Sequence, residues 1–169
     1  TLYGTLPAAP PPPIAAAVTL NSTVSRGGFE SRWINVTFAV NATDAIAMVL
    51  ELVVPPGCAP AAPCPAVLVV TDHRRWALAA AARGYVAIVP PAGDNNCESP
   101  ACGFVDPARA WGDAYPNATF QLIARRAYMS SRALDYALST GLVNASAVAV
   151  LGHSRFGKQS LLTAAKRVS

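Results

Sequence analysis

Charged residues are scarce in this 169-residue chain: 13% of the residues are Asp, Glu, Lys or Arg, whereas 53% are hydrophobic. This balance excludes intrinsic disorder, because disordered chains lack the apolar surface that offsets the entropy of ordering. A glycine period and a heptad repeat are also missing, which excludes collagen-like and coiled-coil folds. The longest aliphatic run, residues 45–54, contains Glu51 and is shorter than the roughly 20 residues that cross a bilayer. We expect one soluble globular domain that does not associate with membranes.

The thirteen basic residues form no stripe with interleaved aromatic residues, so nucleic-acid binding is not expected. The net charge of +4 leaves anionic ligands open. Residues 1–20 have no basic segment followed by an apolar one, so we expect any signal peptide to lie upstream or to have been removed. Their Ala- and Pro-rich sequence predicts a flexible or polyproline-like lead-in, and we expect the folded domain to occupy 21–169.

Five of the seven asparagines begin an N-x-Ser/Thr triplet, the acceptor motif for N-linked glycans. With 21 serine and threonine residues in 169 positions, chance predicts about one such triplet. Chance occurrence remains the alternative, but the excess indicates a eukaryotic secretory route and hence a secreted protein. The candidate acceptors are Asn21, Asn35, Asn41, Asn117 and Asn144.

The four cysteines form two closely spaced pairs in loop-like sequence rich in Pro, Ala and Gly. In an oxidising compartment each pair predicts a small disulfide loop, Cys58–Cys64 and Cys97–Cys102. Zinc binding is the alternative. It is disfavoured because neither pair is C-x-x-C and no histidine lies close in the sequence. No metal site is expected.

Apolar patterning predicts an α/β fold. The predicted strands cover 33–41, 45–54, 66–70, 85–89 and 147–151. The predicted helices cover 76–83, 120–138 and the segment that follows the turn at 152–157. The first two strands would form a hairpin, and the short apolar runs are typical of parallel strands buried on both faces. The expected order is a leading β-hairpin and then a parallel β-α-β-α-β-α unit with right-handed crossovers, with a long loop at 92–116.

The segment 148–158 carries the clearest chemical pattern: a buried strand runs into Gly152, Ser154 lies at the apex of a turn, and a helix follows. This pattern is typical of a nucleophile elbow, in which a strained turn presents a serine hydroxyl at the end of a strand. The N–H groups of the following helix would face developing negative charge. An ordinary tight turn is the alternative. The usual G-x-S-x-G spacing is altered, because Phe156 replaces the second glycine and Gly157 comes one residue later.

This altered motif, GHSRFGK at 152–158, resembles the G-[CH]-S-R-x-G-K motif of glucuronoyl esterases, carbohydrate esterases with the α/β-hydrolase fold. Weaker similarity lies at 82–86 and 131–136 within a resemblance that covers roughly 45–165. The resemblance implies that Ser154 is the nucleophile and forms an acyl-enzyme, that Arg155 stabilises the oxyanion, and that Lys158 binds hydroxyls of a uronate sugar. Solvated positions in a first helical turn are the alternative for both cations. Two cations at a helix N-terminus oppose the macrodipole, which favours a functional role.

Two histidines and three loop carboxylates are further candidates. His153 precedes the nucleophile and is expected to point away from it and to pack, not to act as the general base. His73 follows the strand that leads into the second half of the oxyanion hole in α/β-hydrolases, so it is a candidate for lining the site, although the Gly-rich HGG signature is absent. Nothing singles out one of the carboxylates Asp72, Asp94 and Asp113.

In α/β-hydrolases the acid and the base follow the nucleophile along the chain, and Ser154 lies 15 residues before the end of this sequence. We therefore expect the acid and the base to lie beyond Ser169. Residues 21–169 would then be the N-terminal half of a catalytic domain truncated after the nucleophile helix, and we expect the isolated chain to be inactive and unstable. The expected function is that of a secreted, monomeric, cofactor-independent ester hydrolase for cell-wall polysaccharide, most like a 4-O-methyl-glucuronoyl methylesterase. The alternatives are an acetylxylan-type or other carbohydrate esterase and a non-catalytic wall-binding pseudoenzyme.

Overall fold

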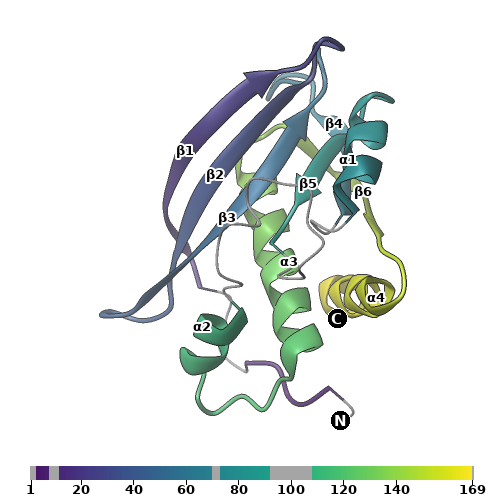
Figure 1. Cartoon of the computed structure of the whole chain (residues 1–169). Helices are drawn as coiled ribbons and strands as arrows, with labels where there is room; N and C mark the ends of the chain where they lie inside the picture. The colour runs from purple at the N-terminus through teal and green to yellow at the C-terminus, as the bar shows by residue number, and fades with distance from the viewer. Residues whose placement is uncertain (1–2, 8–11, 70–72, 92–107, 169) are drawn as a thin grey trace.

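One mixed β-sheet with helices on both faces organises the chain (Figure 1). This computed structural model describes residues 3–7, 12–69, 73–91 and 108–168. Within them, the strands run in the spatial order β1-β2-β3-β5-β4-β6. The strands are β1 (Ile14–Val24), β2 (Glu30–Ala39), β3 (Ala45–Val54), β4 (Cys64–Val69), β5 (Val86–Val89) and β6 (Val143–Leu151). The helices are α1 (Arg74–Ala81), α2 (Ala108–Asp113), α3 (Leu122–Ser139) and α4 (Arg155–Val168).

The first three strands pair in antiparallel order, and β3 also pairs antiparallel with β5. The predicted hairpin is confirmed as β2 and β3, with Asn35 opposite Val49. Alternation explains β2, since Ile34, Val36 and Phe38 are buried on one face of the sheet. The predicted strand at 45–54 coincides with β3, whereas β2 begins three residues earlier than predicted, because Glu30 and Ser31 also join the ladder.

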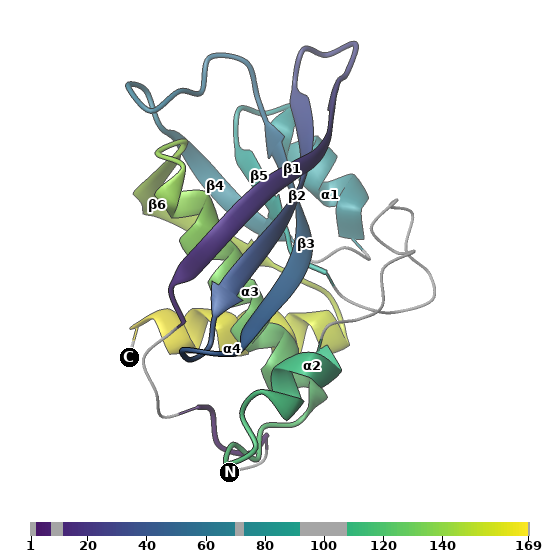
Figure 2. The same cartoon turned by 90° about the vertical axis from the view of Figure 1, so that its left-hand side faces the viewer.

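The other half of the sheet is parallel, with β4 between β5 and β6. Alternate residues of β4 and β5 face two separate apolar clusters, so these strands are buried on both faces as the sequence predicted. Helix α1 covers one face through Ala77 and Ala81, and α3 covers the other. Figure 2 shows α3 and α4 behind the antiparallel strands, and Figure 1 shows α1 beside β5.

Two elements were not expected from the sequence. Strand β1 begins at Ile14, so the predicted irregular lead-in over 1–20 is wrong for residues 14–20. Its residues after Ile14 are exposed, and the strand is held at the sheet edge by its ladder with β2 instead of by burial. Helix α2 lies in the predicted loop at 92–116 and buries Ala108 and Trp111. The order after the hairpin is therefore β-α-β-α-α-β-α.

Helix α3 buries charged side chains as well as apolar ones. The Arg132 side chain is 4% exposed, forms an ion pair with Asp135 at 2.5 Å and lies over the Tyr128 ring. A separate side of α3, at Ala127 and Ser130, packs against α4. Among the described residues, no helix combines the length and the apolar character needed to span a membrane.

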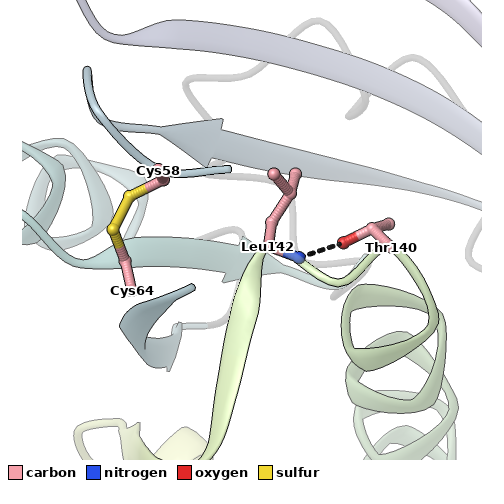
Figure 3. The surroundings of a disulfide bond; sticks show 4 residues. All are labelled: Cys58, Cys64, Thr140 and Leu142. Atoms are coloured by element: carbon pink, nitrogen blue, oxygen red, sulfur yellow. Dashed lines mark hydrogen bonds between the residues drawn. A yellow bond between two sulfur atoms is a disulfide. The ribbon is translucent and has the colours of Figure 1, made fainter. Parts of the chain in front are cut away.

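One predicted disulfide is present. Cys58 and Cys64 are bonded and close the connection between β3 and β4 (Figure 3). Cys64 is the first residue of β4, and its N–H donates to the Leu142 carbonyl at 2.9 Å. The N–H of Leu142 donates in turn to Thr140 Oγ1 at 3.2 Å, so the disulfide lies against the turn that follows α3. The predicted pair Cys97–Cys102 lies outside the described residues.

Candidate active site

Ser154 occupies a strained turn between β6 and α4. Its φ is +56°, the only positive φ of a non-glycine residue in the part of the chain that the structure describes. A left-handed serine costs of order 1–3 kcal/mol and persists only where its surroundings enforce it. The Phe156 N–H donates to the His153 carbonyl and the Lys158 N–H to the Ser154 carbonyl, which closes the turn into the helix. The backbone thus has the strand–turn–helix geometry of a nucleophile elbow.

The glycine at position 152 has a steric cause. A Cβ on Gly152 would overlap the Phe156 carbonyl oxygen and would lie 2.5 Å from Ser160 Oγ. A Cβ on Gly157 would lie 3.4 Å from the Gly152 carbonyl oxygen, which is ordinary van der Waals contact. The first turn of α4 therefore crosses directly over the end of β6, and the Phe156 side chain is buried against the His73 ring.

The first turn of α4 presents Ser154, Arg155 and Lys158 to solvent. The Arg155 guanidinium lies over the Phe156 ring, 5.4 Å from its centroid. Because the N-terminal end of a helix carries partial positive charge, two further cations there create a strongly positive patch around the serine. Such a patch is suited to an oxyanion and to an acidic or polyhydroxylated substrate.

Two polar contacts fix α4 against α3. Gln159 Nε2 donates to Ser130 Oγ at 2.9 Å, and Thr163 Oγ1 contacts the Ala127 carbonyl at 3.4 Å. Gln159, Ser130 and Thr163 are all buried, so these hydrogen bonds are shielded from water. The helix that carries Ser154 is thereby held in one orientation.

His73, the candidate for lining the site, lies beside the elbow. Its ring stacks on Trp76 at 4.3 Å, meets Phe156 edge-on at 5.5 Å and lies 6.2 Å from the ring of His153. The Nε2 atom of His73 is buried and has no hydrogen-bond partner among the described residues. His153 is exposed, and neither imidazole hydrogen-bonds the Ser154 hydroxyl within the described part of the chain. The structure therefore gathers the two histidines of the sequence at the elbow without pairing either with the serine.

A buried ion pair, which the sequence analysis missed, anchors the segment that carries His73. Glu51 on β3 is fully buried and accepts two hydrogen bonds from Arg74, from Nε at 2.7 Å and from Nη2 at 2.6 Å. The Ser31 hydroxyl donates to the same carboxylate. The available signal was a single carboxylate inside an apolar strand, since a buried charge requires a partner.

The remaining predicted residues lie apart from the elbow. Asp113 forms an exposed ion pair with Arg109 on α2, and Asp72 and Asp94 lie outside the described residues. No group of three or more His, Cys, Asp or Glu side chains gathers as metal ligands would, in so far as the chain is described.

The candidate glycan acceptors lie on β1 (Asn21), on β2 (Asn35), in the β2–β3 turn (Asn41), between α2 and α3 (Asn117) and on β6 (Asn144). Of these, Asn35 is partly buried and the other four are exposed.

No protein-family model matches the sequence, and no curated protein matches it. Solved structures do match. A CE15 glucuronoyl esterase from Teredinibacter turnerae T7901 aligns at TM-score 0.62 and 20% identity, over 97% of this chain and 45% of that one. A glucuronoyl esterase from Solibacter usitatus aligns at TM-score 0.66 and 18% identity, over 98% of this chain and 52% of that one. The chain has a glucuronoyl esterase-like fold.

A third similar structure, from Bacteroides fragilis NCTC 9343 and provisionally assigned as an acetyl xylan esterase, aligns at TM-score 0.61 and 12% identity. The alignment covers 90% of this chain and 45% of that one. The chain therefore spans about half the length of these structures. The described sheet ends at β6, which pairs with β4.

Proposed function

We propose that this chain belongs to a serine ester hydrolase that cleaves a uronate ester of cell-wall polysaccharide, with the chemistry of a 4-O-methyl-glucuronoyl methylesterase. The observation that carries the proposal is the positive φ of Ser154 at the end of a parallel strand, with Arg155 and Lys158 in the next turn. The glucuronoyl esterase-like fold supports it.

In the proposed mechanism, Ser154 Oγ attacks the ester carbonyl, and a base takes its proton. The tetrahedral intermediate carries a negative oxygen, which the N–H groups at the start of α4 and the Arg155 guanidinium stabilise. The alkoxide leaves with a proton, which yields an acyl-enzyme that water then hydrolyses. Lys158, one turn further along α4, binds hydroxyls of the uronate. We propose that the acid and the base come from the part of the fold that this chain does not span, so that the isolated chain is inactive.

We also propose that the protein follows a eukaryotic secretory route, is N-glycosylated, forms the second disulfide Cys97–Cys102 and acts as a monomer outside the cell. The disulfide between Cys58 and Cys64 supports an oxidising compartment. The exposure of Asn21, Asn41, Asn117 and Asn144 supports their use as glycan acceptors.

The test uses the full-length protein from a secretory host, assayed against a benzyl ester of glucuronic acid and against a simple acetyl ester. Ser154→Ala should abolish turnover, whereas Ser139→Ala, an exposed serine at the end of α3, should leave it unchanged. Lys158→Ala should raise KM for the uronate ester, whereas Arg109→Ala on the exposed face of α2 should not.

An acetylxylan-type esterase is the second candidate, supported by the Bacteroides fragilis structure. Turnover of the acetyl ester alone would favour it and would remove the role proposed for Lys158. A folded protein that turns over neither ester would instead favour a non-catalytic wall-binding protein.

A further inference from the structure

The N-terminal segment 3–7 is fastened to the connection between α2 and α3. The Gln121 N–H donates to the Tyr3 carbonyl at 3.0 Å, and the N–H of Thr5 donates to Thr119 Oγ1 at 3.1 Å. The Thr119 N–H donates back to Thr5 Oγ1 at 3.3 Å, so the two threonines bond reciprocally. A Cβ on Gly4 would overlap the Thr119 carbonyl, which shows how closely the segments approach. Both views place the N-terminal segment below α2 and against this connection (Figures 1 and 2).

A pocket of about 400 Å³ opens where these two segments meet. Its lining residues are Thr5, Leu6, Pro7 and residues 114–118. One of them, Asn117, heads the glycan acceptor triplet 117–119. A candidate attachment point thus lies on the wall of a pocket within the size range of small-molecule sites.

The aromatic wall of this pocket is rigid. The Ala118 N–H donates to the Tyr115 carbonyl, which makes 115–118 a tight turn. The Tyr115 ring stacks with Trp111 at 6.4 Å and meets Tyr128 edge-on at 5.7 Å. Burial raises the pKa of Tyr128, so its hydroxyl stays protonated, 3.4 Å from that of Tyr115. A fixed aromatic ring two residues before the acceptor is suited to the apolar C–H face of a pyranose.

We propose that the first N-acetylglucosamine of a glycan on Asn117 packs into this pocket against Tyr115 and Leu6, and so fastens segment 3–7 to the α2–α3 connection. The inference rests on the secretory route proposed above. The covalent step joins Asn117 Nδ2 to the anomeric carbon of a lipid-diphosphate-linked oligosaccharide. The bond from that carbon to the diphosphate oxygen breaks, and one amide proton leaves. In the folded protein the Thr119 hydroxyl, which belongs to the acceptor triplet, is already hydrogen-bonded to Thr5. Transfer of the glycan therefore precedes docking of segment 3–7 onto the α2–α3 connection.

The matched control is Asn144. It is exposed on β6 in a second triplet, and its Oδ1 accepts the Ser146 N–H at 3.0 Å. The full-length protein is produced in a secretory host with high-mannose glycans, and glycopeptide mass spectrometry measures the occupancy of each acceptor. Amide hydrogen exchange of segment 3–7 is then compared in the intact protein, after endoglycosidase H, which leaves one sugar, and after full enzymatic removal.

We expect exchange in segment 3–7 to be unchanged by trimming to one sugar, and to rise several-fold after full removal and in Asn117→Gln but not in Asn144→Gln. Leu6→Ser keeps the glycan but removes part of the apolar pocket wall, so it should raise exchange of segment 3–7 in the glycosylated protein. In the Asn117→Gln background the same substitution should have little further effect. Equal exchange of segment 3–7 in the two Gln variants would mean that the Asn117 glycan does not pack into the pocket, and it would overturn the inference. Occupied acceptors elsewhere with Asn117 empty would overturn it while leaving the secretory proposal standing. Empty acceptors throughout would overturn both.

Discussion

Replacing Arg74 by methionine tests the buried anchor of the α1 segment most directly. The substitution keeps an apolar stem of similar length but leaves the Glu51 carboxylate, which is 0% exposed, with the Ser31 hydroxyl and no cation. Loss of one partner from a buried ion pair costs about 3–5 kcal/mol. Two charge-assisted hydrogen bonds of about 1.5–3 kcal/mol each give a similar value.

Two effects place the expected cost at the low end of that range. The Arg74 side chain is 21% exposed, so water partly reaches the position that it vacates. Arg74 also begins α1, and removing a cation from a helix N-terminus returns about 0.3–1 kcal/mol. We therefore expect Arg74→Met to lower the free energy of unfolding of the full-length protein by about 3 kcal/mol.

The assay is equilibrium unfolding in urea, followed by near-ultraviolet circular dichroism. Arg109→Met is the control, because that side chain is 92% exposed and 3.9 Å from its partner, and it should shift stability by no more than about 0.5 kcal/mol. A double-mutant cycle with Glu51→Gln should give a coupling of about 2 kcal/mol, since the amide needs no cation. A cost below about 1 kcal/mol for Arg74→Met, or additive effects in the cycle, would refute the assignment of this pair as the anchor.

Three further changes test other parts of the structure. The hydrogen bond from Arg32, with a second from Ser22, lowers the pKa of Glu30 from 4.5 to about 2, so the carboxylate stabilises the fold above pH 4.5 and loses that contribution as the pH falls towards 2. Glu30→Gln should thus lower the free energy of unfolding by less than about 1 kcal/mol at pH 7, and urea titrations near pH 2 should show no difference from the wild type. A difference in stability that persists near pH 2 would contradict the ion pair. Gly152→Ala should abolish ester turnover, because the added Cβ overlaps the Phe156 carbonyl. The control Gly27→Ala should keep turnover, because its Cβ lies 3.3 Å from the movable Phe29 ring. An active Gly152→Ala enzyme would disprove the steric account of the elbow. Replacing both Cys58 and Cys64 by alanine should lower the free energy of unfolding by about 2 kcal/mol, as expected for so short a loop. Calorimetry that shows no change would mean that the disulfide does not stabilise the fold.

The sequence predicted those elements whose burial follows a simple rule. Ile34, Val36 and Phe38 are fully buried and alternate with the half-buried Asn35 and Thr37, and the all-apolar β5 reflects burial on both faces. The turn at Ser154 was predicted because Gly152 meets a local steric requirement that can be read from neighbouring residues.

Other features were missed because their cause is not local. Strand β1 shows no alternation of burial, because every residue after Ile14 is exposed in the described structure, and the ladder with β2 defines it. Helix α2, six residues long, is too short to show a helical period. The pairing of Glu51 with Arg74 joins residues 23 positions apart on different elements, which no sequence pattern records. The chemistry proposed for Ser154, Arg155 and Lys158 stays a prediction that the experiments above test.

The seating of α4 on α3 has a consequence for how specificity can change. A helix advances about 100° per residue, so once Gln159 is bound to Ser130 the rotational phase of the whole first turn is set. Arg155 and Lys158 then point in directions about 60° apart, and neither can turn without the other. Small changes in the size of Ser130 or Ala127 on α3 would rotate both cations together and, in the proposed reaction, shift where the uronate binds. Substrate preference can therefore drift through residues on the far side of the helix that never meet the substrate.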